Sequence, residues 1–406
     1  MGKFNHLSHT LFTIKPEFIE KLVKIWVDYH ASDIHITPSK EQVYIRYRIS
    51  WNLESFYWIS LENYDKLLNS IKVASFMAID EHNHIQDWKI IFSIKNNLED
   101  LIVNARVSIL PTIYGENIVM RLLLSNSDRL NINNLWFSEY NKKIISKIKN
   151  MEEWLVLLCW WTWSWKTTTL YSLLNEFNPF TNSIFTLEDP VEYTIKWYIQ
   201  SEVKEKRVGS INTNYTFQEW LVWILRQDPD IIMIWEIRRK EEASICLEAA
   251  NTWHLVMWSI HSNSSIWVIT RLKKLWVEPY VLASSLKYII FQKLVRQICP
   301  NCRESLQFKK TDFPIKFHKY LDKEIYDVYR VNSEWCSKCV KWYNWNTLIS
   351  DIIENDDDIY NLILSWKWDV EIKEILISKW YIPSYVDALY KWLNWFLDIR
   401  EAIAIE

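Results

Sequence analysis

The scarcity of glycine limits what this chain can fold into more than any other feature of its sequence. Glycine occurs 3 times and tryptophan 26 times in 406 residues, whereas ordinary usage of about 7% predicts roughly 28 glycines. Tight turns and helix C-caps use left-handed backbone, which glycine adopts without steric cost. We therefore hypothesise that most tryptophans stand for glycine in the natural polypeptide, as happens when UGA codons that encode glycine are read as tryptophan. The alternative is a genuinely tryptophan-rich protein.

The run CWWTWSWKTT at 159–168 points to the same substitution. With glycine in place of its second and seventh letters, Trp160 and Trp165, it contains G-x-x-x-x-G-K-T, a loop whose backbone N–H groups surround phosphate oxygens. Indole side chains would block that close approach. The run lies between an apolar strand-like segment and a helical one, as the motif requires. We expect the binding residues to be Trp160, Trp161, Thr162, Trp163, Ser164, Trp165, Lys166, Thr167 and Thr168.

Two residues of this loop have expected chemical roles. Lys166 would reach the β- and γ-phosphates of a nucleotide, and the Thr167 hydroxyl would ligate Mg²⁺. The first turn of the helix adds a favourable field for anions.

Bulk composition excludes some function classes. A net charge of −3 provides no overall basic field of the kind that holds nucleic acid. The N-terminal residues contain no long apolar run, so no secretory signal is expected. We also expect no membrane span, because no segment approaches 18 uncharged apolar residues. The longest apolar stretch, 279–295, is interrupted by polar residues and is interpreted as an amphipathic helix.

The first part of the chain is expected to be a small α+β module over residues 1–124. Residues 42–49 alternate in period two, as a half-buried strand does. Helical spacing covers 64–77, and 102–110 and 117–123 again indicate strands. A polar stretch, 125–134, is interpreted as a linker.

Beyond the linker, strand and helix patterns alternate. Such alternation predicts a parallel sheet with crossover helices, here over residues 135–298. A cysteine-bearing insert, 299–345, and a C-terminal helical part, 346–406, are expected to follow. The expected strands are 155–159, 183–187, 231–234 and 255–260, and the expected helices are 166–177, 216–226 and 241–251.

Several polar residues follow the predicted strands. Glu236 comes directly after an apolar strand, from which it could orient or activate an attacking water. Glu188, Asp189 and Glu192 follow another strand, where carboxylates can hold Mg²⁺ through water. Taken alone, that acidic string would be a charged surface turn. His261 could sense a γ-phosphate by hydrogen bonding, although a single histidine is more often structural.

Four of the six cysteines form two C-x-x-C pairs, Cys299–Cys302 and Cys336–Cys339. This spacing lets both thiolates of a pair bind one tetrahedral Zn²⁺. The prediction is a structural zinc site, and the alternatives are reduced or disulfide-bonded cysteines.

Arg106 and Arg121 lie on predicted strands of the first module. Most strand arginines face solvent, but a ring-shaped motor needs positive charge at the γ-phosphate, and these two are the favoured candidates.

Taken together, the motifs resemble those of the type II secretion and type IV pilus assembly ATPases, within the secretion ATPases. In nearly every string, tryptophan stands where that family has glycine. The matching strings are ASDIHI at 31–36, LPTIYGE at 110–116, the phosphate loop, EDPVE at 188–192, LRQDPD at 225–230, IWEIR at 234–238, TWHL at 252–255 and HSN at 261–263.

The resemblance implies an α/β protein, in which an α+β (PAS-like) module precedes a RecA-like P-loop ATPase domain with a zinc-binding insert and C-terminal helices. It implies a cytoplasmic homo-hexameric ring that binds ATP, Mg²⁺ and Zn²⁺, at the inner face of the cell membrane against an integral platform protein. Arg106 and Arg121 would reach the nucleotide. No nucleic-acid partner is expected.

The function expected from this resemblance is ATP hydrolysis that powers pilus or pseudopilus assembly or type II secretion. Two alternatives remain. One is a nucleic-acid translocating P-loop motor, which predicts a basic channel. The other is an inactive ring subunit, which follows if the tryptophans are real.

Overall fold

The computed structural model divides into two compact units, Met1–Asn126 and Ser127–Glu406. The residues described are 17–29, 31–49, 52–95, 100–124, 130–160, 166–203, 216–237, 239–275, 277–334, 336, 339, 342–365, 369–378, 381–394 and 397–405.

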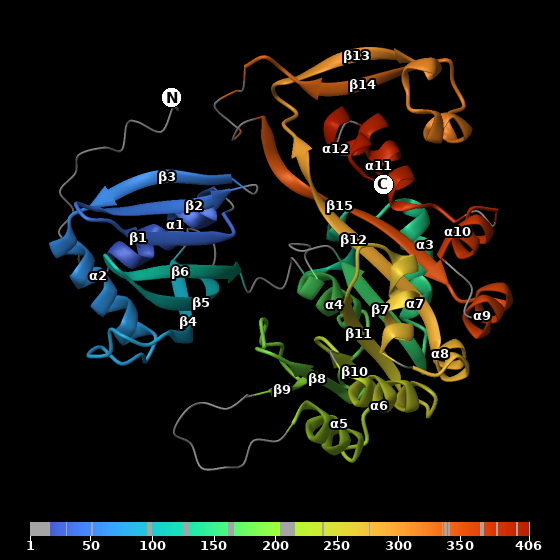
Figure 1. Ribbon diagram of the computed structural model, residues 1–406, viewed down its shortest axis with the longest axis horizontal. Helices are drawn as coiled ribbons and strands as arrows, with labels where there is room; N and C mark the ends of the chain where they lie inside the picture. The colour runs from blue at the N-terminus through green and yellow to red at the C-terminus, as the bar shows by residue number, and fades with distance from the viewer. Residues whose placement is uncertain are drawn as a thin grey trace. The chain divides into compact units, whose positions relative to one another are not determined.

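The first unit is built on a six-stranded antiparallel sheet with strand order β3-β2-β1-β6-β5-β4 (Figure 1). Its described residues form two helices, where the sequence indicated one. Its elements are α1 (Glu17–Asp28), β1 (Asp33–Pro38), β2 (Val43–Ile49), β3 (Asn52–Ile59), α2 (Leu61–Ala74), β4 (Gln86–Lys95), β5 (Asp100–Thr112) and β6 (Gly115–Leu124).

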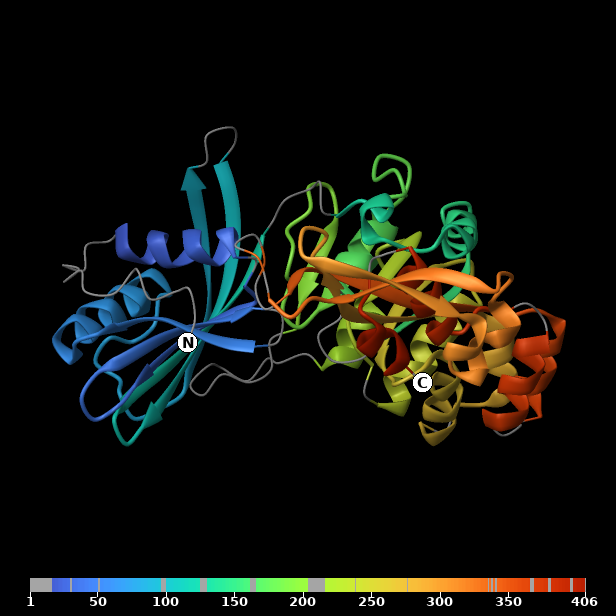
Figure 2. The same cartoon turned by 90° about the horizontal axis from the view of Figure 1, so that it is seen from above.

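Strand alternation gives this sheet two chemically different faces. On one face, Ile34, Tyr47 and Met120 are fully buried and are cross-strand neighbours. The Tyr47 hydroxyl donates to the Leu22 carbonyl of α1 at 3.1 Å, and Figure 2 shows α1 lying along the strands. The opposite face carries charge, because register aligns one residue from each of five strands across it. These are Arg48, Asp33, Arg121, Arg106 and Lys89, on β2, β1, β6, β5 and β4.

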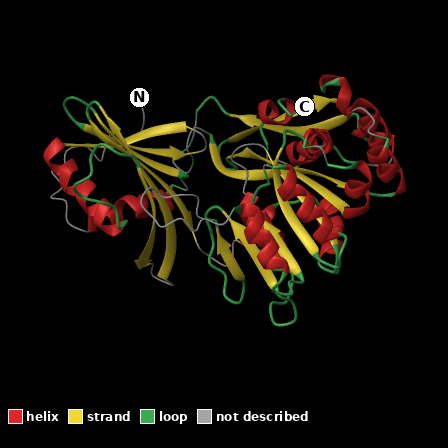
Figure 3. Cartoon of the chain, turned by 60° about the horizontal axis from the view of Figure 1, so that its bottom comes forward, coloured by secondary structure: helices red, strands yellow, loops and turns green. Residues whose placement is uncertain are grey.

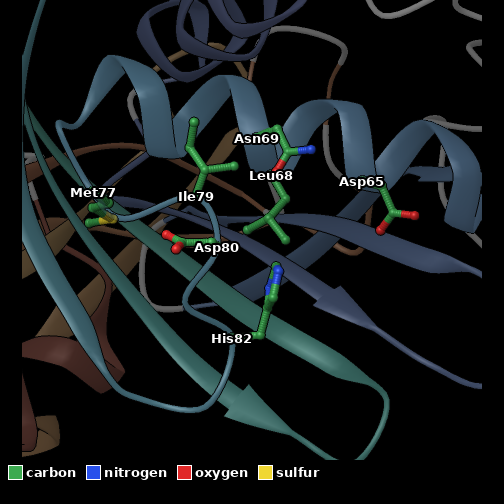
Figure 4. Close-up of a pocket in the computed structure, with 7 residues that line it drawn as sticks. All are labelled: Asp65, Leu68, Asn69, Met77, Ile79, Asp80 and His82. Atoms are coloured by element: carbon green, nitrogen blue, oxygen red, sulfur yellow. The ribbon is translucent and has the colours of Figure 1, made fainter.

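Helix α2 is held to the sheet by a buried ion pair. Lys72 Nζ lies 2.9 Å from Glu116 Oε1, and His82 Nδ1 lies 2.7 Å from Glu116 Oε2. The same Nζ donates to the Glu81 carbonyl at 2.6 Å, so the segment after α2 is fixed as well. Beside it is a surface cavity of about 770 Å³ (Figure 4), lined by Asp65, Leu68, Asn69, Met77, Ile79, Asp80 and His82.

The second unit is built on a seven-stranded sheet with strand order β15-β12-β7-β11-β10-β8-β9. All neighbouring pairs are parallel except β12–β15. Four of the parallel strands, β7, β8, β10 and β11, lie within one residue of the strands expected from the sequence, whereas the sequence indicated no strand at β9 or β12. Its strands are β7 (Trp154–Trp160), β8 (Ile184–Glu188), β9 (Ile199–Glu202), β10 (Ile231–Ile234), β11 (Leu255–His261), β12 (Leu286–Ile298) and β15 (Tyr343–Glu354).

Helices cover both faces of this sheet (Figure 3). Leu155, Leu157 and Cys159 of β7 belong to one core, and Val156 and Leu158 belong to the other. Strands buried on both faces become continuously apolar, which explains the unbroken apolar run of β7. The first core is completed by α5 (Phe217–Leu225), α6 (Lys240–Ala250), α7 (Ser265–Lys274), α8 (Pro279–Ser285), α9 (Asp357–Leu364) and α10 (Asp369–Ser378), and the second by α3 (Glu139–Ile148), α4 (Lys166–Leu174) and the short helix η2 (Ile132–Leu135).

Two sequence expectations are wrong in this unit. The apolar stretch 279–295 is not one helix: α8 ends at Ser285, and β12 continues from Leu286 to Ile298. Because β12 lies between β7 and β15 and is buried on both faces, it shows no alternation that would distinguish it from a buried helix. The part 346–406 is not entirely helical either, because β15 occupies its start.

A third core lies at the far end of β12. There the hairpin β13 (Arg303–Lys309) and β14 (Ile325–Val331), with the short helices η3 (Lys310–Asp312) and η4 (Ile315–Tyr320), packs with α11 (Ser384–Leu393) and α12 (Ile399–Ile403). Trp392 lies at its centre, fully buried, with its indole N–H donating to the Tyr329 carbonyl at 3.2 Å.

Tryptophan dominates the strained backbone positions. Seven non-glycine residues in the described part of the chain have positive φ, and five of them are tryptophan. A left-handed conformation is uncommon for any side chain and unfavourable for a bulky one. The pattern is the one that glycine would produce. The five are Trp136 (φ 58°), Trp154 (φ 92°), Trp197 (φ 75°), Trp253 (φ 64°) and Trp342 (φ 72°).

Candidate functional site

Four parallel strands end at one edge of the large sheet, and their ends carry the residues singled out in the sequence. Register aligns His261 of β11 with Trp160 at the end of β7, and Ile234 of β10 with Leu187 of β8. The carboxyl edge of a parallel sheet is the usual place for a ligand. The structure therefore brings together the start of α4, Glu236, His261 and the acidic turn after β8.

Helix α4 follows β7 and begins at Lys166. Lys166 and Thr167 lie in its first turn, which contains no acidic residue that would repel an anion. Thr167 is buried, at 6% exposure, and Thr168 Oγ1 lies 3.4 Å from the Tyr193 hydroxyl. The backbone of Trp160 closes β7. The other expected loop residues, Trp161, Thr162, Trp163, Ser164 and Trp165, lie outside the described residues.

The Lys166 ammonium lies over the Trp235 ring, 3.4 Å from the ring centroid. A cation in this position is attracted to the indole face. Trp235 directly follows β10, and its N–H donates to the Leu187 carbonyl at 3.0 Å, so its ring is at the same sheet edge. With tryptophan at this position, the indole competes with a phosphate for the lysine.

Glu236 and His261 form a polar pair beside this lysine-bearing helix. His261 Nε2 lies 3.6 Å from Glu236 Oε1, and the side chains are 43% and 11% exposed, respectively. A carboxylate that is largely shielded but still reaches solvent can orient a water molecule. His254, by contrast, precedes β11 at the opposite edge of the sheet, and its Nδ1 lies 3.0 Å from the Ala249 carbonyl oxygen.

The acidic turn divides into a buried and an accessible part. Glu188 is fully buried, and its Oε1 accepts hydrogen bonds from the hydroxyls of Tyr171 at 2.5 Å and Thr186 at 2.7 Å. Burial raises the pKa of Glu188 to about 7, although the hydrogen bonds from Tyr171 and Thr186 act to lower it. Its Oε2 has no hydrogen-bond partner in the described part of the chain. Asp189 is exposed and Glu192 is half-buried.

Sequence reasoning missed Tyr171 and Gln200 in this cluster. Gln200 Nε2 donates to the Tyr171 hydroxyl at 2.6 Å and to the Tyr193 carbonyl at 2.8 Å, joining β9 to α4. A polar residue within an otherwise buried helix was the available signal, but only the tertiary structure identifies its partner.

The four cysteines of the C-x-x-C pairs converge beside the β13–β14 hairpin. Their sulfur atoms all lie within 4.8 Å of one another, with Sγ–Sγ distances of 3.8 Å for Cys299–Cys336 and 3.6 Å for Cys302–Cys339. These are too long for disulfides. Four thiolates at about 2.3 Å from one Zn²⁺ form a tetrahedron with edges of about 3.8 Å, so the cluster fits that ion.

The arginines Arg106 and Arg121 are neighbours in register on β5 and β6 of the first unit. Arg121 Nε donates to Asp33 Oδ1 at 3.1 Å, and Arg106 Nη2 donates to Asp87 Oδ2 at 2.7 Å. Arg48 Nε also lies 3.7 Å from Asp33 Oδ2. Both candidates therefore lie on the charged face of their own sheet, each beside a carboxylate.

Comparison with known proteins identifies relatives along most of the chain. A family model described as "Type II/IV secretion system protein" matches residues 11–388. The type II secretion system ATPase E of Vibrio cholerae is 34% identical over 82% of this chain and 64% of its own length. The type IV pilus assembly ATPase PilB of Thermus thermophilus is 32% identical over 96% of this chain and 42% of its own length. The chain thus spans roughly half of these relatives.

Solved structures share the fold at low sequence identity. The Legionella pneumophila ATPase DotB has a TM-score of 0.70 and 16% identity, with 98% of this chain and 97% of that chain covered. The pilus retraction motor PilT, solved with ADP, has a TM-score of 0.60 and 19% identity, with 96% of each chain covered. Among the helices described, none has the length and apolar character needed to cross a bilayer.

Proposed function

This chain belongs to the type II/IV secretion system protein family, and we propose that it is an ATP hydrolase that drives assembly of a type IV pilus or pseudopilus, or type II secretion. The observation that carries the proposal is the convergence of α4, Glu236, His261 and the acidic turn at one carboxyl edge. The Vibrio cholerae and Thermus thermophilus relatives described above are named as ATPases of those systems.

The proposed mechanism assigns each polar group a place around the nucleotide. Lys166 binds the β- and γ-phosphates, together with backbone N–H groups of the preceding loop, for which glycine is needed at Trp160 and Trp165. Thr167 would be the direct protein ligand of a bound Mg²⁺, and Glu188, Asp189 and Glu192 would be candidates for holding it through water. When bound, Mg²⁺ neutralises charge on the phosphates during in-line attack.

Glu236 orients the attacking water, and its neighbour His261 donates a hydrogen bond toward the γ-phosphate. The separation of 3.6 Å between their side chains supports a shared site, because both side chains lie at the same carboxyl edge of the sheet and are farther apart than in a short ion pair. Arg106 and Arg121 supply additional positive charge from the first unit. Loss of their phosphate contacts after hydrolysis would let the two units shift as rigid bodies.

We further propose a homo-hexameric ring on the cytoplasmic face of the inner membrane, acting on an integral platform protein. The four-cysteine cluster would hold a structural Zn²⁺ that stabilises the β13–β14 lobe, which consists of this hairpin and the short helices η3 and η4. Its sulfur geometry supports closed tetrahedral coordination with no open position for catalysis.

ATP turnover of the Lys166→Ala variant tests the site. We expect hydrolysis to be abolished, because the lysine charge on the β- and γ-phosphates is lost, whereas Lys323→Ala, on the exposed surface of the insert, should retain wild-type turnover. Glu236→Gln should bind nucleotide but hydrolyse it slowly. Retained turnover in Lys166→Ala would refute the assignment.

The same assay separates the alternatives. A nucleic-acid motor would show turnover stimulated by DNA, which the net charge of −3 disfavours. An inactive ring subunit would assemble without turnover and would contain tryptophan in its natural phosphate loop.

A further inference from the structure

A buried carboxylate lies close to the proposed site but takes no part in the chemistry described above. Asp351 of β15 is 2% exposed. Register pairs it with Phe291 of β12, which is paired on its other side with Cys159, one residue before the end of β7. Burying a carboxylate is unfavourable unless polar contacts compensate for lost hydration. The groups around Asp351 therefore indicate the role of this residue.

These groups come from two other parts of the chain. The carboxylate of Asp351 lies beside the hydroxyls of Ser265, Tyr381 and Ser384 and the backbone N–H of Ser384, which lower its pKa against the raising effect of burial, and its Oδ1 has no hydrogen-bond partner in the described part of the chain. The hydroxyls of Ser265 and Tyr381 are also 3.1 Å apart. All three partner residues are themselves buried, at 9% exposure or less. Three segments that are distant in sequence therefore meet at one charged group.

The first segment leads directly from the proposed site. Ser265 opens α7 and follows His261 by four residues. Hydrogen bonds hold the intervening turn together, because Ser262 Oγ donates to the Ser264 carbonyl at 2.9 Å and Ser264 Oγ accepts from the Trp267 N–H at 3.2 Å. Because these bonds restrain the turn, a displacement of His261 should also move Ser265, whose side chain is buried in the core.

The other partners belong to the C-terminal helices. Tyr381 follows α10, and its N–H donates to the Leu376 carbonyl of that helix at 3.3 Å. Ser384 is the first residue of α11. Since Tyr381 and Ser384 lie beside Asp351 as Ser265 does, and the hydroxyls of Tyr381 and Ser265 contact each other, the carboxylate lies where the turn after β11 meets the junction between α10 and α11.

We propose that Asp351 is a positioning residue that holds the His261–Ser265 turn in place for nucleotide hydrolysis and couples it to the junction of α10 and α11. This inference rests on the proposed function. Asp351 touches no reacting atom; it acts through Ser265 and Tyr381. In a water-excluded core such polar contacts are strong and costly to leave unmade, so the turn and the helix junction should move together.

A merely structural role is the competing explanation, and the chain offers a matched control for it. Asp387 of α11 is also fully buried. It accepts from the Ser350 N–H at 2.9 Å and from Lys391 Nζ at 2.9 Å, one residue away from Asp351 along β15. No contact links it to the His261–Ser265 turn within the described chain. Its loss should therefore affect folding without affecting the turn.

The first test measures ATP turnover of Tyr381→Phe and Ser265→Ala at a temperature where both remain folded. We expect kcat to fall by about tenfold with KM nearly unchanged, because a misplaced turn impairs the reacting geometry more than ground-state binding. The double variant should be no worse than the more impaired single variant, since both act through one carboxylate. Asp387→Asn should unfold at a lower temperature and keep wild-type kcat.

Hydrogen exchange provides a readout that does not depend on catalysis. Amides of the peptide spanning residues 261–267 should exchange faster in Tyr381→Phe than in wild type or Asp387→Asn. If exchange in this peptide and kcat are both unchanged in Tyr381→Phe and Ser265→Ala, the proposal is overturned. If exchange rises but even the wild type hydrolyses no ATP, the link between turn and helices stands, and the proposed function fails instead.

Discussion

Replacement of Trp253 by glycine should stabilise the protein, which reverses the usual effect of deleting a large side chain. Trp253 has φ 64°, and left-handed backbone costs a side-chain-bearing residue about 1–2 kcal/mol. Its side chain compensates little through burial, since the residue is 81% exposed. Glycine removes the strain, so we expect a net gain of about 1 kcal/mol, which corresponds to a rise of roughly 2–4 °C in Tm for a unit of this size.

Trp392 is the matched control. It is fully buried, lies within α11, and packs against Phe313 with ring centroids 5.1 Å apart. Its indole N–H is also satisfied by the Tyr329 carbonyl. Trp392→Gly should therefore cost about 3–5 kcal/mol from the lost core packing, and a further amount of about 1 kcal/mol from glycine within a helix. The two substitutions are chemically identical and should act in opposite directions.

Chemical denaturation of the two variants measures these differences, and peptide mass spectrometry of the natural protein tests the underlying hypothesis. Peptides spanning Trp253 and the other positive-φ tryptophans should each be lighter by the difference between an indolylmethyl group and a hydrogen atom. The corresponding codons should be UGA. Loss of stability in Trp253→Gly, or tryptophan at this position in the natural peptide, would refute the reasoning from backbone strain.

Three further predictions concern the stability of the two units. Removal of Zn²⁺ by a chelator, or by Cys336→Ser, should lower the unfolding midpoint of the β13–β14 lobe and leave kcat of the folded protein unchanged; inactivation of a still-folded, zinc-free protein would contradict a purely structural metal. Lys72→Met should cost about 3 kcal/mol because it leaves the buried Glu116 without its lysine partner and in contact with His82, and Glu116→Gln in the same chain should recover part of that loss in a denaturation series. The pKa of Glu188 is raised to about 7 from an ordinary 4.5, so the folded state holds this proton more tightly than the unfolded state does. The free energy of unfolding should therefore fall by roughly 3 kcal/mol as pH rises from 4.5 to 7. Glu188→Gln should flatten the pH dependence of the unfolding midpoint over that range, apart from the contribution of Asp351, whose pKa burial raises to about 6.

Four of the parallel strands could be predicted from the sequence because each is an apolar run between turn signals. β10 spans the expected residues, Ile231–Ile234, and β7 extends the expected strand by one residue at each end. Glu236 and His261 could also be placed at one edge, since parallel strands carry their carboxyl ends together. The distance between these two side chains follows from the sheet order, in which β10 and β11 are neighbours.

Other features could not be predicted because they depend on long-range pairing. β12 is an interior strand and not an edge strand because β15 pairs with its outer edge, and β15 begins 45 residues after β12 ends. The hydrogen bonds between Tyr171 and Glu188, and between Ser265 and Tyr381, join residues whose proximity no local pattern indicates. A sequence reveals the acidic string after β8, but it does not tell which carboxylate of that string faces the core.

The two arginines proposed to reach the nucleotide should differ in what their removal costs, because their present partners differ. Arg121 and Arg48 share Asp33, whose side chain is 2% exposed; Arg121→Ala leaves that buried carboxylate with less compensation and should lower the stability of the first unit. Arg106 and Asp87 form an exposed pair, at 56% and 40% exposure, which contributes little to folding. Arg106→Ala should therefore keep the wild-type unfolding midpoint while lowering kcat, whereas Lys89→Ala, the next residue in the same cross-strand row, should change neither. An Arg106→Ala protein with wild-type kcat would exclude this residue from the reaction, whereas a lowered kcat could not be attributed to a folding defect, because the exposed pair contributes little to stability.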